Sequence, residues 1–171
     1  ELNRLIDHEI ELAKSGKQGR IILKMNALQD PAMIERLYEA SQAGVKIDLI
    51  VRGICCLIPG RKYSRNIRVT RIVDTFLEHA RVWYFGNGGK PKLFLGSPDW
   101  MRRNLYRRIE AVTPILDPDL KRELSDMLSI QLSDKRKACF VDDHLRNRWK
   151  SARPQKEKIR SQYTFYEYLK G

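Results

Sequence analysis

A histidine, an acidic residue and an arginine lie together where an apolar segment gives way to a strand-like run. Glu78-His79-Ala80-Arg81 separates an apolar, helix-like turn that begins at Ile72 from the strand-like run Val82-Trp83-Tyr84-Phe85. Histidine can exchange a proton or attack phosphorus near neutral pH, and arginine presents a planar fork that matches phosphate oxygens. These residue types therefore favour phosphate chemistry, although a lone histidine is also common as a structural or surface residue.

Two further segments place phosphate-binding groups at the ends of expected strands. Arg52 directly follows the strand expected over 45–51, and Ser97-Pro98-Asp99 follows the strand expected over 92–95. Ser97 as N-cap and Pro98 at the first helical position predict a helix start, whose free N–H groups would bind anions. Each feature also has a simpler explanation, because Arg52 could pair with an acidic neighbour and helix capping alone accounts for Ser97.

The composition favours a polyanionic partner. The 171 residues suffice for one domain with a real core, and their net charge of +12 favours nucleic acid, anionic membrane, nucleotides or phosphate chains over a merely basic surface. No apolar run approaches a membrane span, and no secretory signal pattern is present. The three cysteines include an adjacent pair and lack zinc-site spacing, which favours reduced thiols in the cytoplasm.

The hydrophobic pattern predicts an α/β fold. A helix is expected over 2–14, a strand over 20–24, a helix from Asp30-Pro31 to Gly44, and a strand over 45–51. Strand, helix and strand at this spacing form a βαβ unit, which implies a parallel sheet with a right-handed crossover. The later expected elements are strands over 67–72, 82–85, 92–95, 108–115 and, more weakly, 138–141, a helix from Asp117-Pro118 through Leu128, and a basic helical tail.

Three long blocks of the sequence resemble the carboxy-terminal part of bacterial polyphosphate kinase, which builds inorganic polyphosphate from ATP. They are "LKMNALQDPAMIERLYEASQAGVKIDLIVRGICCLIPG", "IRVTRIVDTFLEHARVWYFGNGG" and "GSPDWMRRNLYRRIE". Their order and spacing are family-like, and the resemblance runs from about Leu2 through the last helix. It implies that residues 1–171 form a single domain, the second of two phospholipase-D-like domains, with a mixed, largely parallel sheet flanked by helices. The upstream domains are absent from the chain.

The resemblance also implies roles for three residues. Arg52, in "IVRGICCL", matches an arginine that binds ATP phosphates, and Arg108, in "YRRIE", matches a further phosphate-contacting arginine. His79, in "FLEHARV", matches a catalytic histidine of the nucleotide site that does not itself carry the phosphoryl group. The phosphorylated histidine and the magnesium-binding positions belong to the preceding domain. We therefore expect ATP and Mg²⁺ in the full-length enzyme, no metal ligand in this chain, and an inactive isolated fragment.

The expected partners follow from the same resemblance. They are ATP, ADP, inorganic polyphosphate and the preceding domains of the same chain, in a homo-oligomeric and cytoplasmic full-length enzyme, with membrane association left open and no nucleic acid expected. Within the phospholipase D superfamily, a His-x-Lys-x4-Asp pattern is followed by Gly-Ser; here the positions hold His79, Arg81, Gly86 and Gly96-Ser97. A nucleic-acid-binding or nuclease-like module of that superfamily remains an alternative, as does a purely structural or oligomerising domain.

Overall fold

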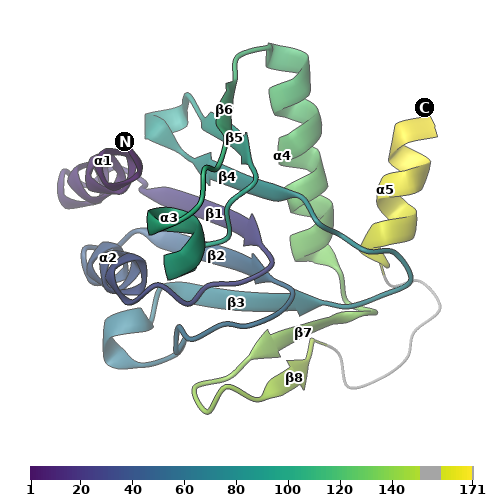
Figure 1. Cartoon of the computed structure of the whole chain (residues 1–171), viewed down its shortest axis with the longest axis horizontal. Helices are drawn as coiled ribbons and strands as arrows, with labels where there is room; N and C mark the ends of the chain where they lie inside the picture. Colours follow the sequence, from purple (N-terminus) through teal and green to yellow (C-terminus); the bar gives the residue numbers. More distant parts are fainter. Residues whose placement is uncertain (151–158, 171) are drawn as a thin grey trace.

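The computed structural model describes residues 1–150 and 159–170, which form one open sheet with helices on both faces (Figure 1). The strand order is β6-β5-β4-β1-β2-β3-β7-β8. The strands are β1 (Arg20–Met25), β2 (Lys46–Val51), β3 (Ile67–Ile72), β4 (Arg81–Phe85), β5 (Lys92–Gly96), β6 (Val112–Ile115), β7 (Ala138–Val141) and β8 (Asn147–Trp149). The helices are α1 (Leu2–Lys14), α2 (Pro31–Gln42), α3 (Arg102–Tyr106), α4 (Pro118–Ser133) and α5 (Ser161–Lys170), with short 3₁₀ turns η1 (Lys62–Ser64) and η2 (Asn87–Gly89).

The centre of the sheet is the predicted βαβ unit. β1 pairs in parallel with β2, and β2 in parallel with β3, with α2 crossing between β1 and β2. The pairs β1–β4, β4–β5, β5–β6, β3–β7 and β7–β8 are antiparallel. The predicted α/β class with a mixed, helix-flanked sheet is confirmed, but the parallel part is limited to three central strands and is smaller than we expected.

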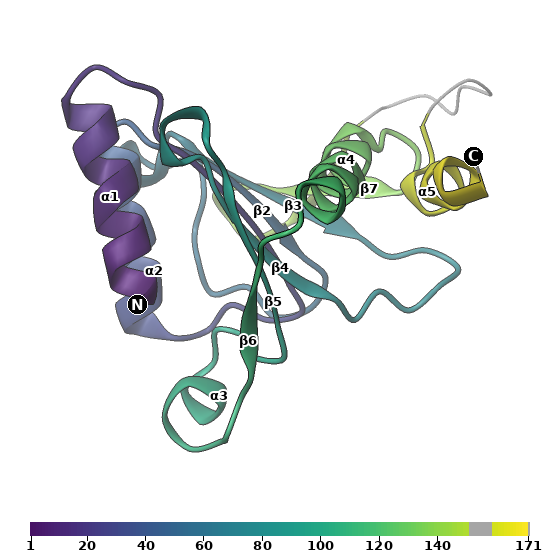
Figure 2. The ribbon, with the colours of Figure 1, turned by 90° about the horizontal axis from the view of Figure 1, so that it is seen from above.

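Alternation along the strands sends apolar side chains to both faces of the sheet. Ile21, Leu23 and Met25 of β1 belong to the larger core cluster, which includes the buried faces of α1 and α2. Ile22 faces the other way and packs in a smaller cluster with residues of α4, including Leu128. Figure 2 shows the result in projection, with α1 and α2 on one side of the sheet and α4 and α5 on the other. The loops at the strand ends are therefore held by a sheet that is packed on both faces.

Local signals set the two main helix starts as predicted. The Asp30 side chain accepts a hydrogen bond from the Met33 N–H at 3.0 Å, and Pro31 takes the first helical position of α2. Asp117 caps α4 in the same way, by accepting from the N–H groups of Asp119 and Leu120. Both predicted Asp-Pro starts are confirmed.

Two predicted helical segments are wrong because tertiary contacts take up their hydrogen-bonding groups. The segment 73–80 is a loop rather than a helical turn, since Phe76 donates its N–H to the Gln162 side chain and accepts from it in return, both at 2.8 Å. No helix starts at Ser97 or Pro98, because the Asp99 carboxylate is engaged elsewhere in the fold and helix α3 begins only at Arg102.

The last part of the chain follows the prediction less closely. The strand expected over 108–115 begins only at Val112, because its partner β5 ends at Gly96, opposite Val112. β7 is confirmed at 138–141, whereas β8 was not predicted. The expected basic helical tail is confirmed for 161–170 as α5, and its segment 151–158 lies outside the described residues.

Candidate active site at the carboxyl edge of the sheet

The loops that follow β1, β2 and β5 are joined at the carboxyl edge of the three parallel strands. Leu28, after β1, forms isolated bridges to Cys55, after β2, and to Trp100, after β5. The Trp100 side chain is fully buried, and its carbonyl accepts hydrogen bonds from the N–H groups of Gln29 and Asp30, both at 2.8 Å. Ligands of open α/β folds bind outside the carboxyl ends of parallel strands, and here those ends are rigidly connected.

Asp99 and Arg81 form a bidentate ion pair at this edge. Arg81 donates from Nε to Oδ1 at 3.2 Å and from Nη2 to Oδ2 at 3.0 Å. Oδ1 also accepts from the backbone N–H groups of Asn26 and Ala27, at 2.8 and 3.1 Å. Burial alone would raise the pKa of Asp99, but the hydrogen bonds from Arg81, Asn26 and Ala27 outweigh it and hold this pKa below its usual value. Asp99 therefore stays ionised and fixes the direction of Arg81.

Arg81 in turn orients His79, whose side chain is exposed. Arg81 Nη1 donates to the His79 carbonyl at 2.8 Å and lies 2.8 Å from His79 Nδ1, with Nε2 farther away at 3.4 Å. Because a guanidinium group only donates hydrogen bonds, the nearer ring nitrogen must act as the acceptor. In the neutral imidazole the proton therefore lies on Nε2, so Nε2–H is the group that a bound phosphate oxygen could accept from.

A buried network anchors the loop immediately before His79. Lys24, which is 5% exposed, pairs with the Glu78 carboxylate at 2.6 Å. The same carboxylate accepts a hydrogen bond from Gln131 of α4 and another from Gln162 of α5, the latter at 3.0 Å. Glu78 thus connects the His79 loop to the sheet and to both helices on one face. His79 is therefore flanked by two anchored residues, Glu78 before it and Arg81 after it.

Arg52 is held at the same edge by the residue that follows β1. Its Nε donates to Asn26 Oδ1 at 3.1 Å, and Asn26 also donates its backbone N–H to Asp99. The next residue, Gly53, donates its N–H to the Asn26 carbonyl, and a Cβ at Gly53 would lie 2.9 Å from that oxygen. Arg71 of β3 donates to the carbonyl of Gly53 at 2.8 Å. A continuous chain of contacts therefore runs from Arg52 through Asn26, Asp99 and Arg81 to His79.

Arg108 lies farther along this edge, in the exposed segment between α3 and β6. It lines a cavity of about 700 Å³ with Trp83, Phe94 and Glu110, and neither Arg52 nor His79 lines that cavity. Hydrogen bonds from Ser97 and Asn104, followed by the charges of Arg108 and Arg81, lower the pKa of Glu110. The charges of both arginines thus favour the ionised form of the same carboxylate.

Ser97 does not have the anion-binding role expected of it. Its hydroxyl donates to Glu110 and accepts from the Ala111 N–H at 3.1 Å, while its own N–H donates to the Ala111 carbonyl at 2.9 Å. These contacts join β5 to the start of β6 and leave no free helix terminus. The expectation of a phosphate-binding helix start at Ser97 is therefore wrong.

Sequence reasoning missed Asn26 and Glu78 and misread Asp99. Asn26 is a polar residue directly after a buried parallel strand, the same signal that singled out Arg52, and it could have been found in that way. Asp99 was interpreted as part of a helix cap, and Glu78 was assigned no role. Their partners lie 18 and 54 residues away in sequence, at Arg81 and Lys24, and no local pattern indicates them.

Two solved structures of low sequence identity share the fold of this chain. A phospholipase D family member, Nuc from Salmonella typhimurium, matches with a TM-score of 0.52 at 17% identity, over 72% of this chain and 84% of that one. NucT from Helicobacter pylori matches with a TM-score of 0.53 at 12% identity, over 75% of this chain and 87% of that one. At these identities the likeness shows a shared fold.

The chain belongs to the family described as polyphosphate kinase C-terminal domain 2, whose model matches residues 1–162. The crystal structure of polyphosphate kinase from Porphyromonas gingivalis matches with a TM-score of 0.95 at 56% identity, over 98% of this chain and 26% of that one. The polyphosphate kinases of Vibrio vulnificus and Escherichia coli K12 are each 46% identical, over 100% and 99% of this chain. The chain spans about a quarter of the length of these relatives.

Proposed function

We propose that this chain is the part of a polyphosphate kinase that binds the phosphates of ATP while the γ-phosphate is transferred to inorganic polyphosphate. The main support is the continuous series of hydrogen bonds at the carboxyl edge that joins Arg52, Asn26, Asp99, Arg81 and His79. The chain also matches the family model over 162 residues. The reaction is reversible phosphoryl transfer through a phosphohistidine that residues outside this chain provide.

Two arginines neutralise phosphate charge in this proposal. Arg52 uses one nitrogen, Nε, to hold Asn26, which leaves the outer nitrogens of its fork for phosphate oxygens. Arg108 is exposed and lies beside Glu110, so it would contact a more distant part of the phosphate chain. Phosphoryl transfer depends mainly on positioning and on stabilising charge over the equatorial oxygens, which is work that fixed arginines perform.

His79 is the proposed catalytic residue. With Nδ1 turned to Arg81, its Nε2–H can donate to an oxygen of the transferred phosphoryl group or to the leaving phosphate as the P–O bond breaks. The nucleophile in this scheme is a histidine of the preceding domain, which forms the new P–N bond and later passes the phosphoryl group to the end of the polymer. His79 thus holds a proton at a defined atom without forming a covalent bond.

Magnesium, which kinases of this type use with ATP, does not fit the residues described here. In the ranges 1–150 and 159–170, no group of three or more His, Cys, Asp and Glu side chains could hold a metal ion. Asp99 is already occupied by Arg81 and two backbone N–H groups, and Glu110 by Ser97 and Asn104. We therefore assign no metal ligand among the residues that the structure describes.

The nuclease-like alternative is less well supported by the site. At the position of the superfamily lysine, Arg81 is committed to Asp99, and the aspartate position is Gly86, where a Cβ would lie 2.9 Å from the Cβ of Arg20. A carboxylate therefore does not fit there without moving β1. Binding to duplex DNA that excess polyphosphate fails to displace would favour the alternative over the kinase proposal.

The direct test is the His79→Ala variant of the full-length kinase that contains this chain. We expect polyphosphate synthesis from ATP to fall by about a hundredfold or more, in the range of a lost general acid. His144→Ala is the matched control, because His144 is also exposed but lies in the β7–β8 turn, away from the carboxyl-edge site, and it should leave the rate unchanged. A folded His79→Ala enzyme with normal synthesis would show the proposed role to be wrong.

A further inference from the structure

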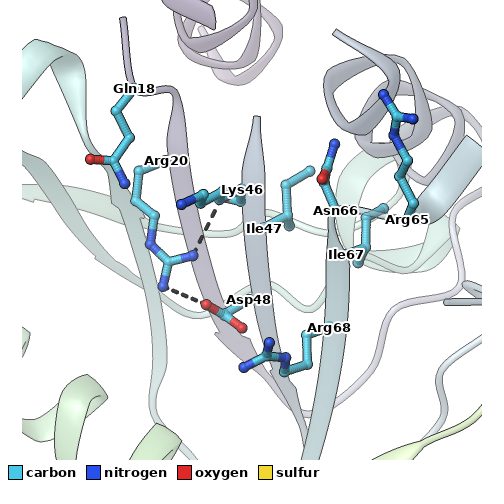
Figure 3. Close-up of a pocket in the computed structure, with 9 residues that line it drawn as sticks. All are labelled: Gln18, Arg20, Lys46, Ile47, Asp48, Arg65, Asn66, Ile67 and Arg68. Carbon is cyan, nitrogen blue, oxygen red and sulfur yellow. Dashed lines mark hydrogen bonds and ion pairs between the residues drawn. The ribbon is translucent and has the colours of Figure 1, made fainter. Parts of the chain in front are cut away.

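A second basic hollow lies at the amino ends of the parallel strands, on the edge of the sheet opposite to His79 (Figure 3). Its volume is about 510 Å³. Arg20 and Lys46 are the first residues of β1 and β2 and face each other in the register, and Arg65 and Arg68 flank the start of β3. We call this feature the amino-edge hollow. None of its residues takes part in the carboxyl-edge site.

The hollow carries a surplus of positive charge. Its one carboxylate, Asp48, pairs with Arg20, whose Nη1 also donates to the Lys46 carbonyl at 3.4 Å. Figure 3 shows this pairing on the strands, with Arg68 below it and Arg65 at the upper right, beside Asn66. Within the described residues, Lys46, Arg65 and Arg68 form no ion pair. In the part of the chain that the structure describes, these three cationic side chains line one hollow and form no ion pair with a carboxylate.

A further cation lies beside the hollow. The guanidinium carbon of Arg68 lies 5.6 Å from the centre of the Phe140 ring, and Lys150 Nζ lies 4.8 Å from it. Burial, together with the charge of Arg68, lowers the pKa of Lys150, while Asp134 and Asp48 oppose this shift. No aromatic ring lines the hollow itself. This excess of cationic side chains suits an anion that carries many charges.

A neighbouring hollow extends this basic surface along the same edge. It has a volume of about 530 Å³ and shares Gln18 and Arg20 with the amino-edge hollow. It adds Lys17, Tyr84 and the glycines of η2, Gly88 and Gly89. The two hollows adjoin over β1, so the basic surface is elongated across β4, β1, β2 and β3. An elongated basic surface fits a linear polyanion better than a single compact phosphate.

We propose that the amino-edge hollow binds a stretch of inorganic phosphate chain, as a polymer-holding site separate from the site of phosphoryl transfer. The inference rests on the proposed function for the identity of the polyanion. Arg65 and Arg68, at the start of β3, hold non-bridging oxygens of successive phosphates, and Lys46 at β2 and then Lys17 beside β1 extend the contact along the edge toward β4. The site keeps the polymer on the enzyme between transfers, so it acts on polyphosphate affinity and leaves ATP affinity unchanged.

The test is the double variant Arg65→Ala/Arg68→Ala in the full-length kinase. We expect the dissociation constant for a chain of several tens of phosphates to rise about tenfold or more, because each arginine–phosphate contact is a charge-assisted hydrogen bond. Its dependence on salt should become shallower, since fewer counterions are released on binding. The dissociation constant for ATP should stay unchanged. Arg65→Lys/Arg68→Lys should keep most of the affinity, and Arg122→Ala, an equally exposed position on α4, should keep all of it.

Three outcomes would overturn the inference. They are unchanged polyphosphate binding by the double variant, an equal loss of ATP and polyphosphate affinity, and a loss of duplex DNA binding with polyphosphate binding retained. If the double variant is unfolded by circular dichroism, Lys46→Gln provides the same comparison, because Lys46 is exposed. The result is independent of the His79→Ala test, since polyphosphate binding is measured in the absence of turnover.

Discussion

The Asp99 carboxylate and the Arg81 guanidinium are joined by two hydrogen bonds of 3.2 and 3.0 Å. This ion pair connects the other residues of the carboxyl-edge site. On one side it orients His79 through Arg81, and on the other it holds the backbone of Asn26, whose side chain holds Arg52. Two residues 27 positions apart in sequence, Arg52 and His79, are thereby placed by one buried carboxylate. In the proposed function, both residues act on the phosphates of one nucleotide.

Replacing Asp99 by Asn should destabilise the chain by about 2–4 kcal/mol at pH 7, because a buried charge-assisted pair is lost while Arg81 stays charged. The folded-state pKa of Asp99 is depressed, so its stabilising contribution is present above its unfolded pKa of about 3.9 and is lost as the pH falls through the lower folded value. Urea unfolding at pH 7 and near pH 3 measures the difference.

The free energies of unfolding of the wild-type chain and of Asp99→Asn should differ clearly at pH 7 and become similar as the pH falls. Asp119→Asn, on the exposed surface of α4, should change stability little at either pH. A gap between wild type and Asp99→Asn that stays constant down to pH 3 would contradict the ionised, Arg81-bound carboxylate.

Glu78→Gln should destabilise the chain by about 3 kcal/mol, because it leaves the buried Lys24 ammonium without its carboxylate. Adding Lys24→Met should restore much of this loss, since the unpaired charge is then removed. In the full-length kinase, Glu78→Gln should lower kcat with little change in KM for ATP, because it loosens His79 and leaves Arg52 in place. The measurements are urea midpoints of the single and double variants and steady-state kinetics; no recovery in the double variant would rule out this explanation.

Helices α2 and α4 and the central strands could be predicted from the sequence because local chemistry sets them. Asp30-Pro31 and Asp117-Pro118 begin helices through their own side chains, and the alternating apolar residues of 45–51 suit a strand with partners on both sides. The loop at 73–80 could not be predicted, because Gln162, 86 residues from Phe76, replaces the hydrogen bonds that a helical turn would have made.

In the candidate site too, local signals identified single residues, whereas contacts between distant residues could not be predicted. Arg52 was found because it directly follows a parallel strand, His79 because it lies beside Arg81 at the start of a strand, and Arg108 because of resemblance to a known family. Their fixed arrangement depends on Asp99, which the sequence presented as a helix cap. The amino-edge hollow was not predicted at all, because Arg20, Lys46 and Arg68 are spread over three strands and meet only when β1, β2 and β3 pair in register.

The two adjacent cysteines should differ strongly in reactivity. Burial raises the pKa of the Cys55 thiol to about 11, and its Sγ lies 3.7 Å from the Leu57 carbonyl, whereas Cys56 is exposed. Because the thiolate is the reactive form, Cys55 should stay a thiol at pH 8, and iodoacetamide should label Cys56 at least about tenfold faster. Mass spectrometry of the folded chain measures this ratio, and labelling in urea should abolish it. Equal rates in the folded chain would contradict the packing of the segment after β2.

The central claim is that the carboxyl edge holds the phosphates of a nucleotide, and calorimetric titration of the full-length kinase with AMP, ADP and a non-hydrolysable ATP analogue tests it most directly. Arg52→Ala should weaken binding of the ATP analogue about tenfold or more, with a smaller loss for ADP and the smallest for AMP, because a removed phosphate-binding group costs more as phosphates are added. Arg61→Ala, an exposed arginine paired with Asp143, should leave all three affinities unchanged. Equal affinity of wild type and Arg52→Ala for every nucleotide would contradict the claim.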